Sequence, residues 1–391
     1  MDIPPLRPSF LAIDFYCGAG GTTRGLLDAG GYVIAGIDKD PDCEDTYRKN
    51  NTNQTLDGVQ PAYLAFDLFL QTDDYPEGQQ DEAFEAVGNL IAKYREMSPD
   101  TPLLFAICAP CQSFTKFVQH HLTDARATSR TRDENLLAQT IRFIREFSPD
   151  MIMSENVAGI RRGKYAGLWA GFQDELHGMD YVLGDSDVCA SRFGVPQKRK
   201  RSILLAVKAG DATSDLIVPD QDEETVEVSA REALGTFPRL EAGQFDESVP
   251  NHQCRGLAPI NRERLMSLRP GQPNFDLPID LQLPCHRRLE EKGKRGFGDV
   301  YTRLAPDRPA PTITTRFHSV SNGRFGHYDM AQPRGLSLRE GASLQSFPED
   351  YEFHGRSMDA IAKMIGNAVP PKLSRFMAEY LLRIHSQGAP S

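Results

Sequence analysis

Residues 103–112 read Leu-Leu-Phe-Ala-Ile-Cys-Ala-Pro-Cys-Gln, an apolar run followed by a proline-containing turn with Cys111 and Gln112. A second apolar run, Met151–Met153, leads to Glu155 and Asn156. We interpret both runs as buried strands of one parallel sheet, in which ligands gather beyond the carboxyl ends of the strands. Cys111 and Glu155 are therefore candidates for a nucleophile and an acid that act on the same substrate.

The segments around these two runs alternate between strand-like and helix-like patterns. Leu136, Leu137, Ile141 and Ile144 share roughly one helical face. This alternation predicts an α/β fold with a doubly wound, largely parallel sheet, of the Rossmann-like kind. The predicted strands are Leu11–Tyr16, Tyr32–Ile37, Leu64–Phe66, Leu103–Ile107, Met151–Met153 and Ser202–Val207, and the predicted helices are Thr22–Ala29 and Glu134–Phe147.

The alternation stops near residue 210. An acidic stretch follows there, and then a region rich in Pro, Gly and Arg that extends to about residue 335. Helical periodicity returns at Leu338–Leu344 and Lys372–Ile384. We therefore predict that residues 1–209 and 336–391 form one domain, and that residues 210–335 form a smaller inserted domain.

The composition is typical of a soluble globular protein, with 40% hydrophobic and 25% charged residues in 391. No apolar run reaches the length of a membrane span, and the N-terminus lacks a signal pattern. With seven cysteines and no secretion signal, we expect reduced thiols and a cytoplasmic location. Cys108 and Cys111 form a CxxC without a second pair, so we expect no metal site, and thiol redox chemistry is a distant alternative.

The charges are distributed unevenly along the chain. The net charge is −10, which argues mildly against a nucleic-acid partner. However, residues 285–339 hold eleven Lys and Arg against five Asp and Glu, whereas residues 211–247 hold eleven acids against two Arg. Because phosphate contacts are local and are screened over about 10 Å, a basic face can bind DNA on an acidic protein. The alternative is that these charges only solvate a surface.

The chain resembles the DNA (cytosine-5) methyltransferase family in six motifs that follow one another in that family's order. Together these motifs span most of the chain, and the ordered set is far more specific than any one of them. The motifs are Asp14-Phe-Tyr-Cys-Gly-Ala-Gly-Gly21, Pro110-Cys-Gln112, Glu155-Asn-Val157, Gln197-Lys-Arg-Lys-Arg201, Arg303-Leu304 with Pro311-Thr-Ile-Thr-Thr315, and Gly366-Asn-Ala-Val-Pro-Pro371.

The resemblance implies that S-adenosylmethionine is the cofactor. From the residues alone, the glycine turn after the first strand allows a ligand close to the backbone, and Asp38 after the second strand can bind ribose hydroxyls. Lys39 departs from the bulky apolar residue that the family often has at this position. The family's cofactor-binding positions carry over to Tyr16, Gly18, Gly20, Asp38, Asp67, Leu136, Asn367 and Val369.

The resemblance also implies a covalent mechanism on cytosine. Cys111 would attack C6 of the ring, and Glu155, as the protonated acid, would donate to N3. Arg199 and Arg201 would stabilise the developing charge, with Asn156 and Gln112 beside the reacting groups. Because a stacked base is out of reach, the target would be flipped out, and the loop Ser113–Arg132 would close over it.

The expected activity is methylation of cytosine at C5 in a specific sequence of double-stranded DNA, read by the inserted domain. Two alternatives stay open: methylation of RNA, as in a tRNA-acting branch of the family, and a catalytically silent DNA-binding protein. We expect a monomer of prokaryotic or phage origin, and leave open a restriction endonuclease or another defence protein as partner. The basic residues of the reading region are Arg262, Arg264, Arg287, Arg288, Lys292, Lys294, Arg295 and Arg303.

Overall fold

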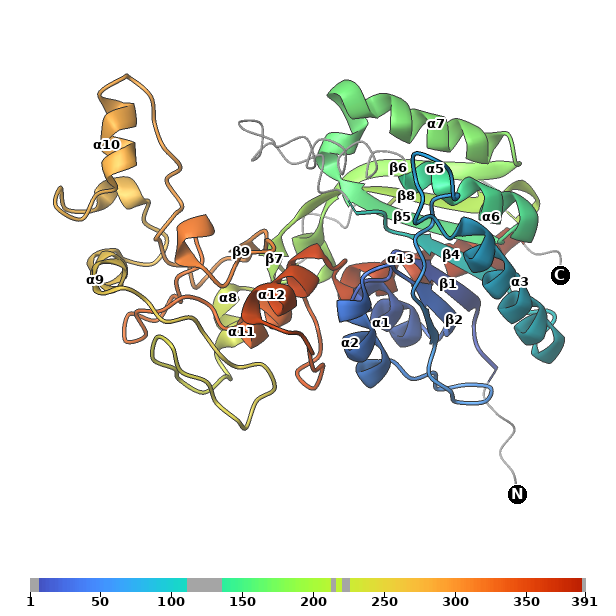
Figure 1. Cartoon of the computed structure of the whole chain (residues 1–391), viewed down its shortest axis with the longest axis horizontal. Helices are drawn as coiled ribbons and strands as arrows, with labels where there is room; N and C mark the ends of the chain where they lie inside the picture. The colour runs from blue at the N-terminus through green and yellow to red at the C-terminus, as the bar shows by residue number, and fades with distance from the viewer. Residues whose placement is uncertain (1–6, 111–135, 212–215, 220–225, 389–391) are drawn as a thin grey trace. The chain divides into compact units, whose positions relative to one another are not determined.

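The computed structural model describes residues 7–110, 136–211, 216–219 and 226–388 (Figure 1). The chain forms two compact units. The first unit comprises residues 1–189, 200–223 and 369–391, and the second comprises residues 190–199 and 224–368. The second unit is thus wider than the inserted domain predicted at 210–335.

A seven-stranded sheet lies at the centre of the first unit, in the order β3-β2-β1-β4-β5-β8-β6. From β3 to β5 all neighbours pair in parallel, whereas β8 is antiparallel to both of its neighbours, β5 and β6. The predicted α/β fold is therefore confirmed. The strands are β1 Leu11–Phe15, β2 Tyr32–Ile37, β3 Ala62–Leu64, β4 Leu103–Ile107, β5 Met151–Val157, β6 Tyr181–Cys189 and β8 Lys200–Lys208.

Helices cover both faces of this sheet. Figure 1 shows α1 (Gly21–Asp28), α2 (Glu44–Asn50) and α13 (Pro371–Gly388) on one side of it. Gly25 lets α1 and α13 approach closely, because a Cβ there would lie 2.4 Å from the carbonyl oxygen of Pro371. The opposite face carries α3 Gln80–Met97, α5 Leu136–Gln139, α6 Ile141–Phe147 and α7 Ala166–His177.

Within the described residues, the predicted helix Glu134–Phe147 forms two separate helices, α5 and α6. Between α5 and α6 lies Thr140, which is fully buried and whose hydroxyl donates to the Leu137 carbonyl at 2.8 Å. A threonine that bonds to nearby backbone in this way competes with regular helical bonding. The apolar face was predicted correctly, since Leu136, Leu137 and Ile144 are buried in the core beneath this part of the sheet.

The second unit contains little regular structure. Its strands β7 (Gln197–Lys198) and β9 (Ala310–Pro311) form a short parallel pair. Its helices are α8 Ala230–Leu234, α9 Pro259–Ser267, α10 Pro284–Glu290, α11 Leu338–Leu344 and α12 Met358–Asn367. The short 3-10 helices of the two units are η1 Pro41–Cys43, η4 Ala158–Arg161, η5 Gly163–Tyr165, η6 Ala190–Phe193, η7 Ala209–Asp211, η8 Asn274–Asp276 and η9 Val320–Asn322.

Buried arginines organise this loop-rich unit. Arg303 is fully buried and donates to the carbonyls of Leu265, His327, Asp329 and Gln332. Arg334, 1% exposed, donates to both carboxyl oxygens of Glu340. Such side chains provide hydrogen bonds to buried carbonyl and carboxylate oxygens. Of the C-terminal helices predicted to rejoin the first unit, α11 lies in the second unit, and α13 lies in the first.

Candidate active site

Glu155 lies near the carboxyl end of β5 and contacts Arg201, which follows the first residue of β8. The two strands are antiparallel, with Glu155 opposite Ile203 and Val157 opposite Arg201. Glu155 and Arg201 are thus two positions apart and share one face of the sheet. Arg201 Nε lies 2.7 Å from Glu155 Oε1, and the two side chains are 11% and 8% exposed. The structure therefore brings these two predicted catalytic residues into a nearly buried ion pair.

Next to this pair, β4 and β5 diverge. Their parallel register runs from Leu104 and Met151 to Ala106 and Met153. Beyond it, the Ser154 hydroxyl donates to the Ile107 carbonyl at 2.6 Å and takes over the link between the strands. Polar side chains at a point where strands separate can hold the start of a ligand-facing turn in place.

The turn after β4 is described as far as Pro110, which is exposed. Cys111, Gln112 and the predicted lid Ser113–Arg132 lie outside the described residues. Cys108 directly follows β4, and burial raises the pKa of its thiol well above the ordinary value, with the Glu155 carboxyl adding to this effect. Cys108 is therefore a neighbour of Glu155 and remains protonated at neutral pH.

The Gln197–Arg201 motif is divided between the two units, and its side chains serve different purposes. Gln197 donates to the Leu344 carbonyl at 2.9 Å and accepts from the Ile313 amide at 2.9 Å. Arg199, 3% exposed, donates to the carbonyls of Ile313, Gly366 and Ala368 at 3.1–3.3 Å. These three carbonyls all belong to the second unit, whereas Arg201 pairs with Glu155 in the first.

Asn156 follows Glu155 on β5 and is 1% exposed. Its side-chain oxygen accepts from the Val157 amide at 3.0 Å, which holds the end of the strand. The residue is placed beside the Glu155–Arg201 pair, and its assignment to the catalytic set stays a prediction.

The glycine turn after β1 has the conformation that its sequence requires. Gly18 and Gly20 have φ angles of 51° and 88°, in the left-handed region that favours glycine. Among the described residues, a Cβ at Gly18 would meet only Asp38 Oδ2, at 4.0 Å, so this part of the chain leaves open space above the turn beside the carboxyl group. A ligand can therefore approach the backbone there.

Asp38 is fixed by the turn that it faces. Its Oδ2 accepts from the Gly18 amide at 2.9 Å, and its Oδ1 accepts from the Asp40 amide at 2.8 Å. Lys39 lies alongside: its ammonium group binds Asp67 Oδ2 at 3.1 Å. Lys39, the residue that departs from the family pattern, thus neutralises Asp67, a carboxylate predicted to touch the cofactor.

Tyr16 and Leu136 meet although 120 positions separate them. The Tyr16 hydroxyl donates to the Leu136 carbonyl at 2.6 Å. Burial raises the pKa of this phenol well above its ordinary value, and Asp67 and Asp38 add to the effect. The structure thus joins six of the predicted cofactor residues around one turn of the first unit: Tyr16, Gly18, Gly20, Asp38, Asp67 and Leu136.

The last two predicted cofactor residues lie where the chain passes from the second unit to the first. Asn367 ends α12 and is exposed, and Val369 is buried in the first unit. Gly366 approaches the backbone of Thr314 and Thr315 within the second unit, where a Cβ would lie 2.4 Å from backbone atoms. Only glycine fits at this contact.

Sequence reasoning missed Asp14 as an individual residue. It is fully buried on β1, where the Thr23 hydroxyl donates to its Oδ2 at 2.7 Å. Burial raises the pKa of Asp14 to about 7, although the bond from Thr23 opposes the rise. An acid inside the apolar run Leu11–Phe15 was the available signal, since buried carboxyl groups without a cation are rare.

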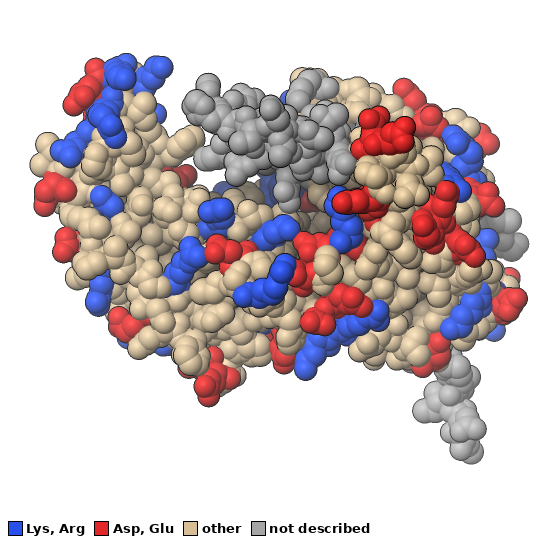
Figure 2. Space-filling view, viewed as in Figure 1, with Lys and Arg blue, Asp and Glu red and all other residues tan. Residues whose placement is uncertain are grey.

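The basic residues predicted to read DNA separate into buried and exposed sets. Arg264 donates to the Leu281 carbonyl at 2.8 Å and Arg303 is fully buried, so both support the fold. Figure 2 shows Lys and Arg atoms gathered over the segment labelled α10 in Figure 1. The exposed cations of this α10 segment are Arg287, Arg288, Lys292, Lys294 and Arg295.

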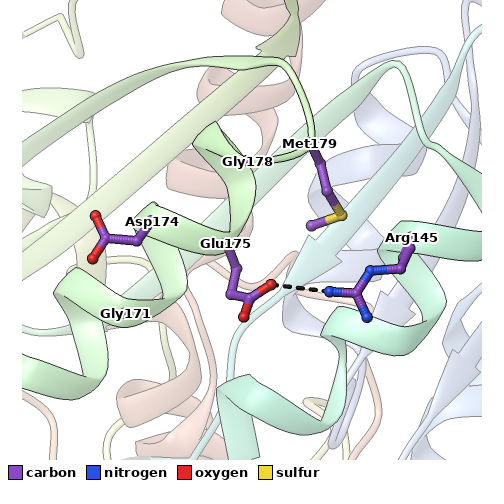
Figure 3. A pocket seen from close by; sticks show the side chains of 6 residues that line it. All are labelled: Arg145, Gly171, Asp174, Glu175, Gly178 and Met179. Atoms are coloured by element: carbon purple, nitrogen blue, oxygen red, sulfur yellow. Dashed lines mark hydrogen bonds and ion pairs between the residues drawn. The ribbon is translucent and has the colours of Figure 1, made fainter.

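A shallow pocket of about 470 Å³ lies elsewhere, between α6 and α7 (Figure 3). Arg145 and Glu175 pair across it at 3.0 Å. It contains none of the motif residues. Among the described residues, no group of His, Cys, Asp and Glu is placed to hold a metal ion, and none of the described helices is long and apolar enough to cross a membrane.

A largely parallel sheet with a glycine turn after β1 and an acid after β2 is typical of Rossmann-like α/β proteins. The model of the C-5 cytosine-specific DNA methylase family matches residues 87–383, and the chain belongs to this family. The predicted family and enzyme class, DNA (cytosine-5) methyltransferase, are confirmed.

Relatives match over most of their length. The chain is 32% identical over 374 residues to the Type II methylase M.HgiDII of Herpetosiphon aurantiacus, covering 95% of this chain and 94% of that protein. It is 27% identical over 383 residues to the Type II methyltransferase M1.HphI of Haemophilus parahaemolyticus, covering 97% and 88%.

Solved structures share the fold. A putative DNA modification methyltransferase encoded within an E. coli prophage has a TM-score of 0.66 at 20% identity, covering 96% of this chain and 99% of that one. The S. pombe Dnmt2 methyltransferase has a TM-score of 0.55 at 16% identity, covering 96% and 98%. At these identities the likeness supports the fold alone.

Proposed function

We propose that this chain transfers a methyl group from S-adenosylmethionine to C5 of cytosine at a specific sequence in double-stranded DNA, through a covalent adduct of Cys111 with a flipped base. The observation that carries the proposal is the nearly buried Glu155–Arg201 pair beside the strand that leads to Pro110 and Cys111. Arg201 holds the carboxyl by Oε1, near the carboxyl end of β5, where the base would enter.

The chemistry explains why an acid is needed beside the thiol. Cytosine C5 is a poor nucleophile, so the Cys111 thiolate adds to C6 while a proton carried by Glu155 passes to N3, which places electron density at C5. Arg201 would then stabilise the Glu155 carboxylate that is left, in the pair that the structure shows. After the methyl group is transferred, loss of the C5 proton expels the thiolate. A free thiol with a pKa of about 8.5 is already about 10% ionised around pH 7.5, so further ionisation gains about tenfold, whereas general acid help gives about 10² to 10⁴-fold.

S-adenosylmethionine, when bound, supplies a methyl group activated by its sulfonium. The cofactor fits the first unit, because the space above Gly18 lies beside an acceptor that two backbone amides already orient. We assign ribose binding to Asp38 and close backbone approach to Gly18 and Gly20. The remaining cofactor residues of the proposal are Tyr16, Asp67, Leu136, Asn367 and Val369.

A duplex containing 5-fluorocytosine at the target tests the mechanism. Fluorine cannot leave C5 as a proton does, so the reaction stops at the adduct and a shifted band should appear on a denaturing gel. We expect the band only with cofactor present and not with Cys111→Ser. Bisulfite sequencing of DNA from cells that express the chain identifies the target sequence. No shifted band on the mapped site would overturn the covalent mechanism.

We also propose that the second unit reads the target sequence, and that a monomer acts alongside a restriction endonuclease of the same specificity. The relatives of the chain named above are Type II enzymes, which motivates the proposal of a restriction endonuclease as partner. DNA from expressing cells should resist cleavage at the mapped sequence. Methyl incorporation into DNA and into tRNA, measured side by side, distinguishes this substrate from RNA.

A further inference from the structure

An exposed aromatic residue follows the α10 segment. Phe297 stands between Gly296 and Gly298, two residues after Arg295. Its side chain is 64% exposed. A phenylalanine in water leaves a large apolar surface uncovered, so its position among exposed cations needs an explanation.

The backbone around Phe297 is held firmly although the ring is exposed. Asn274, 3% exposed, donates from its side-chain nitrogen to the carbonyls of Phe297 at 2.8 Å and Val300 at 3.0 Å. The backbone amide of Asn274 donates to the Gly298 carbonyl at 2.8 Å. One buried residue therefore fixes the chain at Phe297 and on its C-terminal side.

The flanking glycines add to this fixation. A Cβ at Gly296 would lie 2.4 Å from the His286 ring, and one at Gly298 would lie 2.8 Å from the Phe275 ring. The loop therefore packs closely on these two rings, and Arg295 lies 4.7 Å over Phe275. Because the loop is fixed before any partner binds, little conformational entropy would be lost when the ring is covered.

We propose that Phe297 stacks on the bases of the DNA duplex, as an apolar wedge at a base step beside the target. The inference rests on the proposed function, since DNA is the partner. Cations of the α10 segment precede the ring in the sequence and can bind phosphates. The acids nearby in the sequence are Glu290, Glu291 and Asp299, of which Asp299 pairs with Arg324 at 2.6 Å. Apolar side chains that enter a groove partially unstack a step.

Phe245 provides a matched control. It lies in the same unit and is also 64% exposed, but Asp246 and Glu247 follow it. These acids would repel phosphates, so Phe245 should not contact DNA. Both phenylalanines are exposed, so replacing either should leave the fold intact, which thermal melting can verify.

The test uses the full chain and a duplex with the mapped target and 2-aminopurine at neighbouring positions. Phe297→Ala should weaken DNA binding about tenfold, within the range for loss of a base–aromatic stack, and should reduce the 2-aminopurine signal of unstacking. The slope of log affinity against log salt should stay unchanged, because no phosphate contact is lost. Phe297→Trp should restore binding, and Phe245→Ala should behave as the unaltered chain.

Unchanged affinity and fluorescence in Phe297→Ala would overturn the proposal, as would an equal loss in Phe245→Ala. A changed salt slope would mean that the substitution disturbs the cations instead, which also contradicts stacking. These outcomes differ from failure of the proposed function, in which the unaltered chain would not methylate the duplex at all.

Discussion

At the scale of single residues, two arginines of one motif have separate tasks. Arg201 meets a carboxyl group that the proposed chemistry needs, and Arg199 meets carbonyls of Ile313, Gly366 and Ala368. Both were predicted to stabilise charge in the reaction. The contacts assign this role more directly to Arg201, whereas they make Arg199 a support for the segments that begin at Pro311 and end at Ala368.

Substitution of these arginines should therefore have different effects. Arg201→Gln should lower kcat by roughly 10²-fold, the loss seen when one stabilising donor is removed, while the affinities for DNA and S-adenosylhomocysteine stay nearly unchanged. Arg199→Gln should lower the free energy of unfolding by about 2 kcal/mol, because several buried carbonyls lose a charged donor. Steady-state kinetics and urea unfolding measure the two effects. Equal losses of kcat at similar stability would contradict the division of labour.

At the scale of elements, the buried strands were predictable because they are continuous apolar runs between turns. β2 and β4 have their predicted bounds, and β5 extends past its apolar core to include Glu155. β6 was missed, since Gly184, Asp185 and Asp187 interrupt its pattern and only part of it is buried.

The site was predictable where its residues follow strands, as at Asp38 and Glu155. It was not predictable where partners lie far apart in the sequence, since the carbonyls of Ile313, Gly366 and Ala368 that Arg199 binds are 114 to 169 positions away. The same holds for Arg303, whose cationic character suggested DNA binding. Four backbone carbonyls surround it instead, and burial lowers its pKa to about 10.

The α10 segment is the element whose charge should govern DNA affinity. Neutralising Arg287, Arg288, Lys294 and Arg295 should weaken DNA binding and flatten its salt dependence. Each lost phosphate contact should reduce the slope of log affinity against log salt by about 0.9. Affinity for S-adenosylhomocysteine without DNA should not change, because the glycine turn lies in the other unit. An unchanged slope together with weaker cofactor binding would mean that DNA binds elsewhere.

At the scale of the whole molecule, the two compact units bury different ionisable groups and should respond differently to acid. In the first unit, Asp14 has a raised pKa, so its burial is least costly at low pH. In the second unit, Arg334 beside Glu340 lowers the pKa of this carboxyl to about 2, and burial lowers the pKa of His327 to about 4. Stability from Glu340 is present above its unfolded pKa of 4.5 and is lost as the pH falls toward 2.

His327 makes this acid sensitivity measurable under milder conditions. The unfolded chain takes up its proton near pH 6.5, whereas the folded chain does so only near pH 4, so the second unit should lose stability between these values. The shift corresponds to at most about 3 kcal/mol. His327→Asn should flatten this dependence, because asparagine takes up no proton in this range. The asparagine amide oxygen can still accept from the Asp329 amide, as His327 Nδ1 does at 3.1 Å, so the local structure should be kept.

Calorimetry at several pH values measures this effect. Runs with and without S-adenosylhomocysteine distinguish the two units, since a bound ligand raises the unfolding temperature of the unit that holds it. The transition that the ligand does not raise should move to lower temperature from pH 7 to pH 4.5, and less so in His327→Asn. His354→Asn, which removes a side chain that is 44% exposed in the same unit, should leave the movement as it is. If both substitutions shift the acid response equally, burial of His327 is not its cause.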